Sequence, residues 1–249
     1  MQRYFIETFN DENQAFISGE DVHHISRVMR MEIGDEIICC DSQKRVAICK
    51  ITEITNDSVL ANIVEWVEGS SEIPIQITIA SGLPKGDKLE YVIQKGTELG
   101  ANEFVPFIAA RSIVKWDEKK GVKKLDRWKK IAKEAAEQSH RRMIPSIRSP
   151  QSLKQLVAYS ETFTYKLIAY EEEAKRGEKA NLGKTLDKMN EGDSLFVVIG
   201  PEGGLTDNEV ELLKQHGFVT CSFGPRILRT ETAPLYLLSA VSYHFELAR

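Results

Sequence analysis

Residues 194–210, SLFVVIGPEGGLTDNEV, and residues 218–234, FVTCSFGPRILRTETAP, share one pattern. Each begins with a short apolar run, continues through a loop rich in Gly, Pro or Arg, and ends where a helix is expected to begin. Continuous apolar runs of this length are typical of parallel strands that are buried on both faces. Ligands of open α/β sheets bind at the carboxyl ends of the strands. The two loops are therefore expected to lie at one edge of a sheet and to form the walls of a binding site.

The surrounding sequence, residues 73–249, alternates between strand-like and helix-like segments, which predicts an α/β domain with a mainly parallel sheet. Thr206 and Glu209 have capping-box spacing at the start of one helix, and Gly217 is placed to end it. A long helix is predicted over residues 122–139, with lysines on its outer face. The last helix is apolar almost all round, which suits either a doubly buried core helix or one that contacts a second copy.

Residues 1–72 have a different pattern, with several short β-branched runs separated by turn sequences, and they predict a small β-barrel. One helix is expected to begin with Asp21 as its N-cap. It would bring four apolar side chains to one face, namely Val22, Ile25, Val28 and Met29. His23 and His24 are interpreted as structural rather than as metal ligands. Residues 68–74, EGSSEIP, are a plausible linker between two domains.

Composition and charge limit the function classes. No apolar run is long enough to cross a membrane, and the N-terminal residues do not resemble a signal peptide. Cys39, Cys40, Cys49 and Cys221 form no metal-binding spacing and are expected to be buried, reduced thiols of a cytoplasmic protein. Residues 1–72 carry 6 Lys/Arg against 14 Asp/Glu, whereas residues 111–148 carry 13 against 5. The second block could match phosphates, although such blocks are more often solvated helix faces.

The glycine spacing of the first loop, GPEGG at 200–204, excludes two common nucleotide sites. It matches neither the G-x-G-x-x-G fingerprint of dinucleotide-binding folds nor the G-x-x-x-x-G-K-[ST] phosphate loop. Glu202 would also repel phosphates, so a neutral or cationic adenosine-type ligand is more compatible. Two tight turns without a ligand remain an alternative on spacing alone.

The combination VIGPEGGLTDNEV and FGPRILRTETAPLYLLSAV resembles the RsmE family of 16S rRNA uridine-N3 methyltransferases, which are SPOUT-class enzymes that use S-adenosyl-L-methionine. HHISRVMRMEIGDEI is similar to the PUA-like N-terminal domain of that family, and KGDKLEYVIQKGTELG and EAAEQSHRRMIP are similar to its methyltransferase domain. The resemblance covers nearly the whole chain. It implies a PUA-like β-barrel over residues 1–72 that binds RNA. It also implies an α/β SPOUT domain over residues 73–249, with a mainly parallel sheet and a trefoil knot.

The same resemblance implies a cofactor, partners and site residues. The cofactor is S-adenosyl-L-methionine, no metal is required, and the partners are a second copy of the chain and 16S rRNA or the assembled small ribosomal subunit. Residues expected to bind the cofactor are Leu167, Ala169, Tyr170, Ile199, Gly200, Pro201, Glu202, Gly203, Gly204, Leu205, Gly224, Ile227, Leu228, Arg229, Thr230, Thr232 and Ala233. Those expected to contact RNA are Arg27, Arg30, Lys85, Lys88, Arg111, Arg141 and Arg142.

Two residues are expected to act in catalysis. Arg229 would stabilise the charge of the deprotonated uracil, because a guanidinium stays protonated and offers a planar fork to an oxyanion. Glu231 would orient Arg229, although the two could also form a purely structural pair. The position of Arg226 leaves open which of the two ligands it would contact. Two further interpretations remain: a non-catalytic RNA-binding assembly factor with the same fold, and a nucleotide-dependent α/β oxidoreductase.

Overall fold

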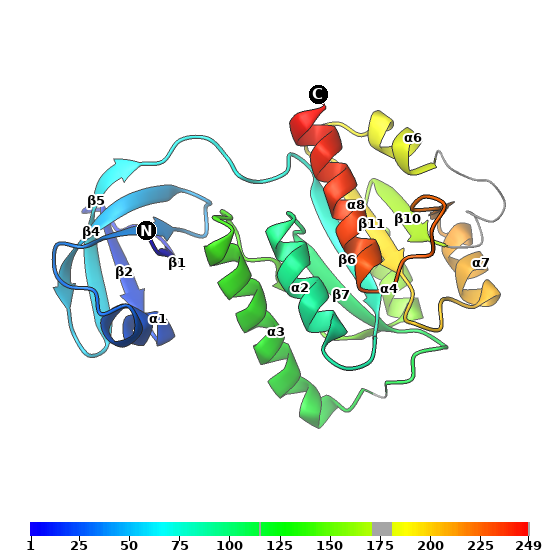
Figure 1. Ribbon diagram of the computed structural model, residues 1–249, viewed down its shortest axis with the longest axis horizontal. Helices are drawn as coiled ribbons and strands as arrows, with labels where there is room; N and C mark the ends of the chain where they lie inside the picture. The colour runs from blue at the N-terminus through cyan, green and yellow to red at the C-terminus, as the bar shows by residue number, and fades with distance from the viewer. Residues whose placement is uncertain (115, 171–180, 249) are drawn as a thin grey trace. The chain divides into compact units, whose positions relative to one another are not determined.

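The computed structural model of the chain describes residues 1–114, 116–170 and 181–248, which form two compact units (Figure 1). The first unit comprises Met1–Glu72 together with Ala136–Met143, and the second comprises Ile73–Ala135 and the residues from Ile144 onward. None of the helices in the described ranges is long and apolar enough to cross a bilayer. All four cysteines are free and buried, as predicted.

The first unit is a curled five-stranded sheet with the order β1-β3-β4-β5-β2. Its strands are β1 (Arg3–Phe5), β2 (Gln14–Ser18), β3 (Glu36–Cys40), β4 (Val46–Ile54) and β5 (Ser58–Trp66). β1 pairs with β3 in parallel, and the other neighbours are antiparallel. Buried and exposed residues alternate along β2, so one face of the sheet packs on the core and the other is solvated.

The helical segment of this unit differs from its prediction. α1 (Glu20–His23) begins two residues earlier than expected, and its N-cap is Gly19 with φ 73°, a left-handed conformation that favours glycine. The chain then widens into a π-helical turn, η1 (His24–Val28). Because a π turn holds more residues than an α turn, the residues after it are rotated away from the face that the α-helical spacing predicts. Val28 and Met29, predicted to face inward, are 58% and 38% exposed.

The residues 136–143 were expected to belong to the methyltransferase domain, but they fold with the first unit. Arg141 is 2% exposed, and its guanidinium binds both carboxylate oxygens of Glu72, with an Nη2–Oε2 distance of 2.5 Å. Arg142 donates its Nη2 to the carbonyl oxygens of Val67 and Glu68. The prediction that Arg141 contacts RNA is therefore wrong, because its guanidinium is buried in an ion pair within the protein. Arg142 is half-buried, and its contact with RNA stays a prediction.

The second unit is built on a seven-stranded sheet in which every pairing is parallel. The strands are β6 (Gln76–Gly82), β7 (Glu103–Ile108), β8 (Ser146–Ile147), β9 (Gln151–Ser152), β10 (Tyr165–Ala169), β11 (Ser194–Ile199) and β12 (Val219–Cys221). The order is β12-β10-β11-β6-β7-β8, with β9 also paired to β7. β6 and β11 are central and almost wholly buried. β11 is continuously apolar after Ser194, as expected for a strand buried on both faces, whereas β6 also buries Thr78 and Ser81.

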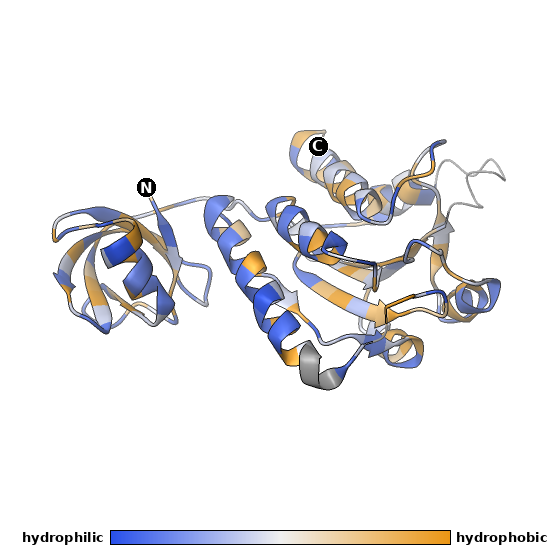
Figure 2. Cartoon of the chain, turned by 60° about the horizontal axis from the view of Figure 1, so that its bottom comes forward, coloured by the Kyte–Doolittle hydropathy of each residue, from blue (hydrophilic) through white to orange (hydrophobic). Residues whose placement is uncertain are grey.

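Helices cover both faces of this sheet, as Figures 1 and 2 show. They are α2 (Lys88–Glu98), α3 (Glu118–Gln138), α4 (Leu153–Ser160), α6 (Asn181–Lys188), α7 (Asp207–Gln215) and α8 (Thr232–Ser242), which continues as the π-helical turn η2 (Tyr243–Leu247). Apolar side chains of α2, α3, α6 and α8 share one core cluster with the sheet, and those of α4 and α7 share another. In Figure 2, α3 is mostly hydrophilic with a few apolar positions, as expected for a helix with one buried stripe.

The capping box of α7 is confirmed. Thr206 Oγ1 accepts from the Glu209 backbone N–H, and the Glu209 carboxylate accepts from the Thr206 N–H at 2.8 Å. Gly217, with φ 82°, follows the helix. The same Glu209 side chain accepts the Ala110 N–H from the loop after β7. The cap thereby links the start of α7 to that loop.

Thr206→Ala removes one half of this capping box and leaves the Glu209 backbone N–H without its cap. We expect a loss of about 0.5–2 kcal/mol in the free energy of unfolding. Urea unfolding followed by circular dichroism would measure it, with Thr206→Ser as the control that keeps the hydroxyl. An unchanged unfolding midpoint for Thr206→Ala would contradict the role of this cap.

Candidate functional site

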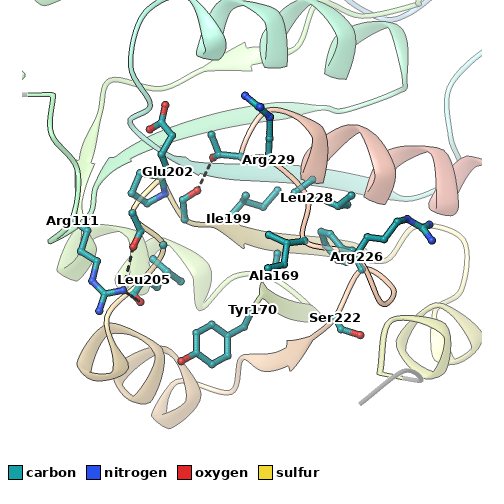
Figure 3. A pocket seen from close by; sticks show the side chains of 18 of the residues that line it. Arg111, Ala169, Tyr170, Ile199, Glu202, Leu205, Ser222, Arg226, Leu228 and Arg229 are labelled. Atoms are coloured by element: carbon teal, nitrogen blue, oxygen red, sulfur yellow. Dashed lines mark hydrogen bonds between the residues drawn. The ribbon is translucent and has the colours of Figure 1, made fainter. Parts of the chain in front are cut away.

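A cavity of about 970 Å³ lies at the carboxyl ends of β10, β11 and β12 (Figure 3). Its walls are Ala169 and Tyr170 at the end of β10, residues 199–205 and Asp207 at and after the end of β11, residues 222–230 after β12, and Lys88, Arg111 and Ala233 from neighbouring segments. The two loops singled out in the sequence thus face one cavity. This is the position at which open parallel sheets bind ligands.

Most residues that were expected to bind the cofactor line this pocket. They are Ala169, Tyr170, Ile199, Gly200, Pro201, Glu202, Gly203, Gly204, Leu205, Gly224, Ile227, Leu228, Arg229, Thr230 and Ala233. Leu167 and Thr232 do not. Leu167 is fully buried among core residues inside β10, two positions before the strand ends. Thr232 is exposed at the first position of α8.

The GPEGG loop needs its glycines for close packing rather than only for turn geometry. Gly204 has φ 69°, and its N–H bonds to the Pro201 carbonyl oxygen at 2.8 Å. A Cβ at Gly203 would lie 2.9 Å from the Cβ of Arg111. Arg111 Nη1 donates to the carbonyl oxygens of Gly203 and Leu205 at 3.1 and 3.3 Å (Figure 3). Arg111, predicted as an RNA contact, therefore also braces the wall of the pocket.

The second loop is fastened to the first. Thr230 Oγ1 donates to the Gly200 carbonyl oxygen at 2.6 Å, which joins the loop after β12 to the loop after β11. The Arg229 carbonyl oxygen accepts the backbone N–H groups of Thr232 and Ala233 and so begins α8. Gly224, with φ 84°, turns the chain at the start of this loop. The two walls of the pocket are thus held together by backbone groups and one threonine.

The charged side chains of the pocket fall into two groups. Lys88 forms ion pairs with Glu202 and Glu231, at 3.0 and 3.2 Å. By contrast, within the residues that the structure describes, the side chains of Arg226 and Arg229 have no hydrogen-bond or ion-pair partner. In Figure 3, Glu202 and Arg229 extend toward the same side of the pocket, and Arg226 extends toward another end.

The pKa values of the paired groups reflect these contacts. The hydrogen bond to Glu202 raises the pKa of Lys88, and Glu231 adds to this effect. Burial acts to raise the pKa of Glu202, but backbone N–H groups and Lys88 outweigh it, so this pKa lies below its ordinary value. Both groups are charged at neutral pH. The negative charge expected to repel phosphates at Glu202 is therefore compensated by Lys88.

Two of the functional predictions need correction. Glu231 does not line the pocket, and the partner that the structure gives it is Lys88 rather than Arg229. Lys88, predicted to bind RNA phosphates, is held by two carboxylates. Lys85 is exposed, and its backbone N–H donates to Glu202. Arg27 and Arg30 are exposed in the first unit, at and after the end of η1.

The sequence analysis missed several lining residues, namely Asp207, Ser222, Phe223 and Pro225. The Tyr170 hydroxyl donates to Asp207 Oδ1 at 3.0 Å, which connects the end of β10 to the start of α7. A usable signal existed for all four. Each lies within three residues of a predicted loop or strand end. Ligands bind at the carboxyl ends of parallel strands, so residues next to these ends are candidates as well.

Comparisons with known proteins agree with this architecture. The RNA methyltransferase domain family matches residues 71–242, and the RNA methyltransferase PUA domain family matches residues 17–64. The chain is 53% identical to ribosomal RNA small subunit methyltransferase E of Bacillus subtilis (strain 168), over 100% of this chain and 99% of the relative.

Two solved structures share the fold over nearly their full length. One is a ribosomal RNA small subunit methyltransferase E from Neisseria gonorrhoeae bound to S-adenosyl methionine, with a TM-score of 0.82, 27% identity and 97% of each chain covered. The other is a Legionella pneumophila protein in complex with the bound cofactor SAM, with a TM-score of 0.82, 32% identity and 96% of each chain covered.

Taken with the parallel sheet and its loop-lined pocket, these matches define an RNA methyltransferase of the SPOUT class that carries an N-terminal PUA domain. The identity to the Bacillus subtilis protein extends over both domains. The chain belongs to the ribosomal RNA small subunit methyltransferase E family. The predicted fold class is confirmed as an α/β domain of the SPOUT class with a parallel sheet, preceded by a PUA domain with a curled sheet. The trefoil knot stays a prediction.

Proposed function

We propose that the protein transfers the methyl group of S-adenosyl-L-methionine to N3 of a specific uridine in the 16S rRNA of the small ribosomal subunit. Membership of the family supports this reaction. The observation that carries it in this chain is the pocket at the ends of β10, β11 and β12, whose 970 Å³ lie within the range of small-molecule and cofactor sites.

The chemistry of the walls suits an adenosine-containing donor. Ile199, Leu205 and Leu228 offer apolar surface, and the glycines at 200, 203 and 204 bring backbone groups close to a ligand. Glu202 is the only carboxylate among residues 199–205, and Lys88 compensates its charge. The carboxylate of the first loop is thus compensated by Lys88, and the carboxylate of Asp207, which also lines the pocket, accepts the Tyr170 hydroxyl.

When bound, the donor supplies an electrophilic methyl carbon, whose bond to sulfur breaks as the uracil N3 lone pair forms the new bond. The residues of the pocket have to align these atoms, which is largely a matter of positioning. N3 must also lose its proton, and the resulting charge spreads onto the uracil carbonyl oxygens. Arg229 is exposed at the pocket and unpaired among the described residues, so its guanidinium can stabilise the negative charge on the uracil oxygens.

RNA recognition is assigned to both units. Arg27 and Arg30 of the first unit, together with Lys85, Arg111 and Arg226 of the second, present exposed cationic side chains that can contact phosphates. The first unit remains acidic overall, so this contact is confined to a part of its surface. Because the substrate is ribosomal RNA, the protein would act in the cytoplasm.

A homodimer is the second part of the proposal. Tyr236 and Tyr243 on α8 and η2 are 40% and 63% exposed, and Leu247 is 75% exposed. These side chains extend an apolar surface from the end of the helix that closes the pocket. Light scattering during size-exclusion chromatography would give the mass, and a monomeric mass at micromolar concentration would argue against the dimer.

The decisive test of the function combines two measurements. Calorimetry with S-adenosyl-L-methionine should show binding, and mass spectrometry of ribosomal RNA from a deletion strain should show one missing methyluridine. A non-catalytic assembly factor would leave the methylation pattern intact. Absence of donor binding would exclude the methyltransferase reaction, and binding of a nicotinamide cofactor instead would favour the oxidoreductase interpretation.

Gly82→Ala should weaken donor binding without touching the donor. A Cβ at Gly82 would lie 2.5 Å from Pro201 Cδ and 2.7 Å from Pro201 N, so the GPEGG loop would have to move. We expect the dissociation constant for S-adenosyl-L-methionine to rise about tenfold, because a displaced wall loses its alignment with the ligand. The control is Gly183→Ala, where nothing lies within 4 Å of the added Cβ. Equal affinity in the two variants would contradict this reading.

A further inference from the structure

Lys88 joins three segments that are distant in sequence. It is the first residue of α2, and its Nζ lies 3.0 Å from Glu202 Oε1 on the loop after β11 and 3.2 Å from Glu231 Oε2 before α8. Glu202 Oε1 also accepts the Lys85 N–H at 3.2 Å. One ammonium group thus serves two carboxylates at the edge of the pocket.

The two carboxylates depend on Lys88 to different degrees. Glu202 has the Lys85 N–H in addition to the ammonium. Glu231 Oε2 is buried and has no hydrogen-bond partner among the described residues, so the ion pair with Lys88 is its compensation. Removing the cation from a largely buried carboxylate is costly, so the loss of Lys88 would favour another cation near Glu231.

The nearest arginine in the sequence is Arg229, two residues before Glu231. The Arg229 carbonyl oxygen accepts the Thr232 N–H, so the chain turns tightly between the two side chains. Both side chains therefore leave the same turn at the start of α8. Even so, the described structure pairs Glu231 with Lys88 and leaves the Arg229 guanidinium unpaired at the pocket.

We propose that Lys88 is a positioning residue that holds the Glu231 carboxylate away from Arg229 and thereby keeps the Arg229 guanidinium available to the substrate. The proposal rests on the proposed methyl transfer and on the role of Arg229 in it. Without Lys88, the Glu231 carboxylate turns to Arg229, and the charge that should stabilise the deprotonated uracil is neutralised within the protein. Lys88 then acts through Glu231 and Arg229 and not by contact with RNA phosphate.

The test is a double-mutant cycle on Lys88 and Glu231. In the wild-type background, Lys88→Met should lower kcat for methyl transfer about tenfold or more, with little change in the KM for the donor. In the Glu231→Gln background, which lacks the competing charge, the same substitution should change kcat less than about twofold. Lys88→Gln serves as the second variant if Lys88→Met is poorly folded. Lys95→Met is the control, because Lys95 lies on the same helix and pairs with Glu98 away from the pocket.

Three outcomes overturn the proposal. An equal loss of kcat in both backgrounds would mean that Lys88 acts independently of Glu231, as an RNA contact or a general structural support. An unchanged kcat in Lys88→Met would mean that Arg229 does not need it. A crystal structure of Lys88→Met gives a readout that does not require activity. The Glu231 carboxylate should lie within hydrogen-bond distance of the Arg229 guanidinium, and a carboxylate that stays apart overturns the proposal. An inactive wild type would instead contradict the proposed function.

Discussion

Arg229→Ala should lower the rate of methyl transfer by about 10²–10³-fold, the usual cost of removing one donor aimed at a developing oxyanion. The affinity for S-adenosyl-L-methionine should change much less than the rate, because the guanidinium is proposed to act on the uracil, although Arg229 also lines the donor pocket. Single-turnover transfer of a labelled methyl group to small-subunit RNA, together with calorimetry of donor binding, separates the two effects.

The reaction's pH dependence gives a second measurement of the same role. Loss of the N3 proton is favoured when a cation stabilises the deprotonated ring. Without Arg229, the uracil N3 should lose its proton only at higher pH. The rate of the Arg229→Ala variant should therefore continue to increase up to a higher pH than the wild-type rate does. Arg229→Lys keeps the charge but loses the planar fork, and it should give an intermediate rate. A rate unchanged in Arg229→Ala, or a loss fully explained by weaker donor binding, would remove Arg229 from this role.

Arg141→Met should destabilise the first unit by about 3–5 kcal/mol, because it leaves the Glu72 carboxylate buried without its cation. Glu72 binds the Arg141 guanidinium through Nε at 3.1 and 3.0 Å and through Nη2 at 2.5 Å. It also accepts the Arg142 N–H at 2.7 Å. The Arg141 carbonyl oxygen accepts from Arg3 Nη1. The pair therefore holds the residues 136–143 against the rest of the unit.

Hydrogen exchange measured by mass spectrometry suits this prediction, since a chain with two units need not unfold in one step. Exchange should accelerate in β3, β4 and β5 of Arg141→Met and change much less in β6 and β11. Arg127→Met is the control. It breaks an ion pair with Glu90 in which the arginine side chain is 66% exposed, and it should cost at most about 1 kcal/mol. If exchange in β3–β5 is the same in both variants, the buried pair does not hold the unit.

A charge-reversal variant of Arg141 would not measure RNA binding. The basic block at 111–148 indicated an RNA contact, and Arg141 was included in it for its charge. A variant with reversed charge would lose RNA binding through unfolding of the unit. Exposed cations such as Arg27 and Lys85 are the appropriate sites for measuring the salt dependence of RNA binding.

The sequence by itself determined the features that depend on neighbouring residues. A continuous apolar run identified the buried parallel strand β11, and the Thr206–Glu209 spacing identified the cap of α7. The same rules placed the loops at 200–204 and 224–230 at one edge of the sheet, where they line the pocket. Strand burial and helix capping are set by residue spacing within one element, so both can be predicted from the sequence alone.

Only the tertiary structure decided which charged side chains are available. Arg141 finds Glu72 at a separation of 69 residues, and Lys88 finds Glu231 across more than half of the chain. It also decided that residues 136–143 fold with the first unit and that a π-helical turn exposes Val28. The sequence shows that a side chain is charged but not which side chain it pairs with, because an ion pair forms wherever folding brings opposite charges together out of water. That the Arg229 guanidinium has no partner among the described residues is therefore a property of the fold and not of its position in the sequence.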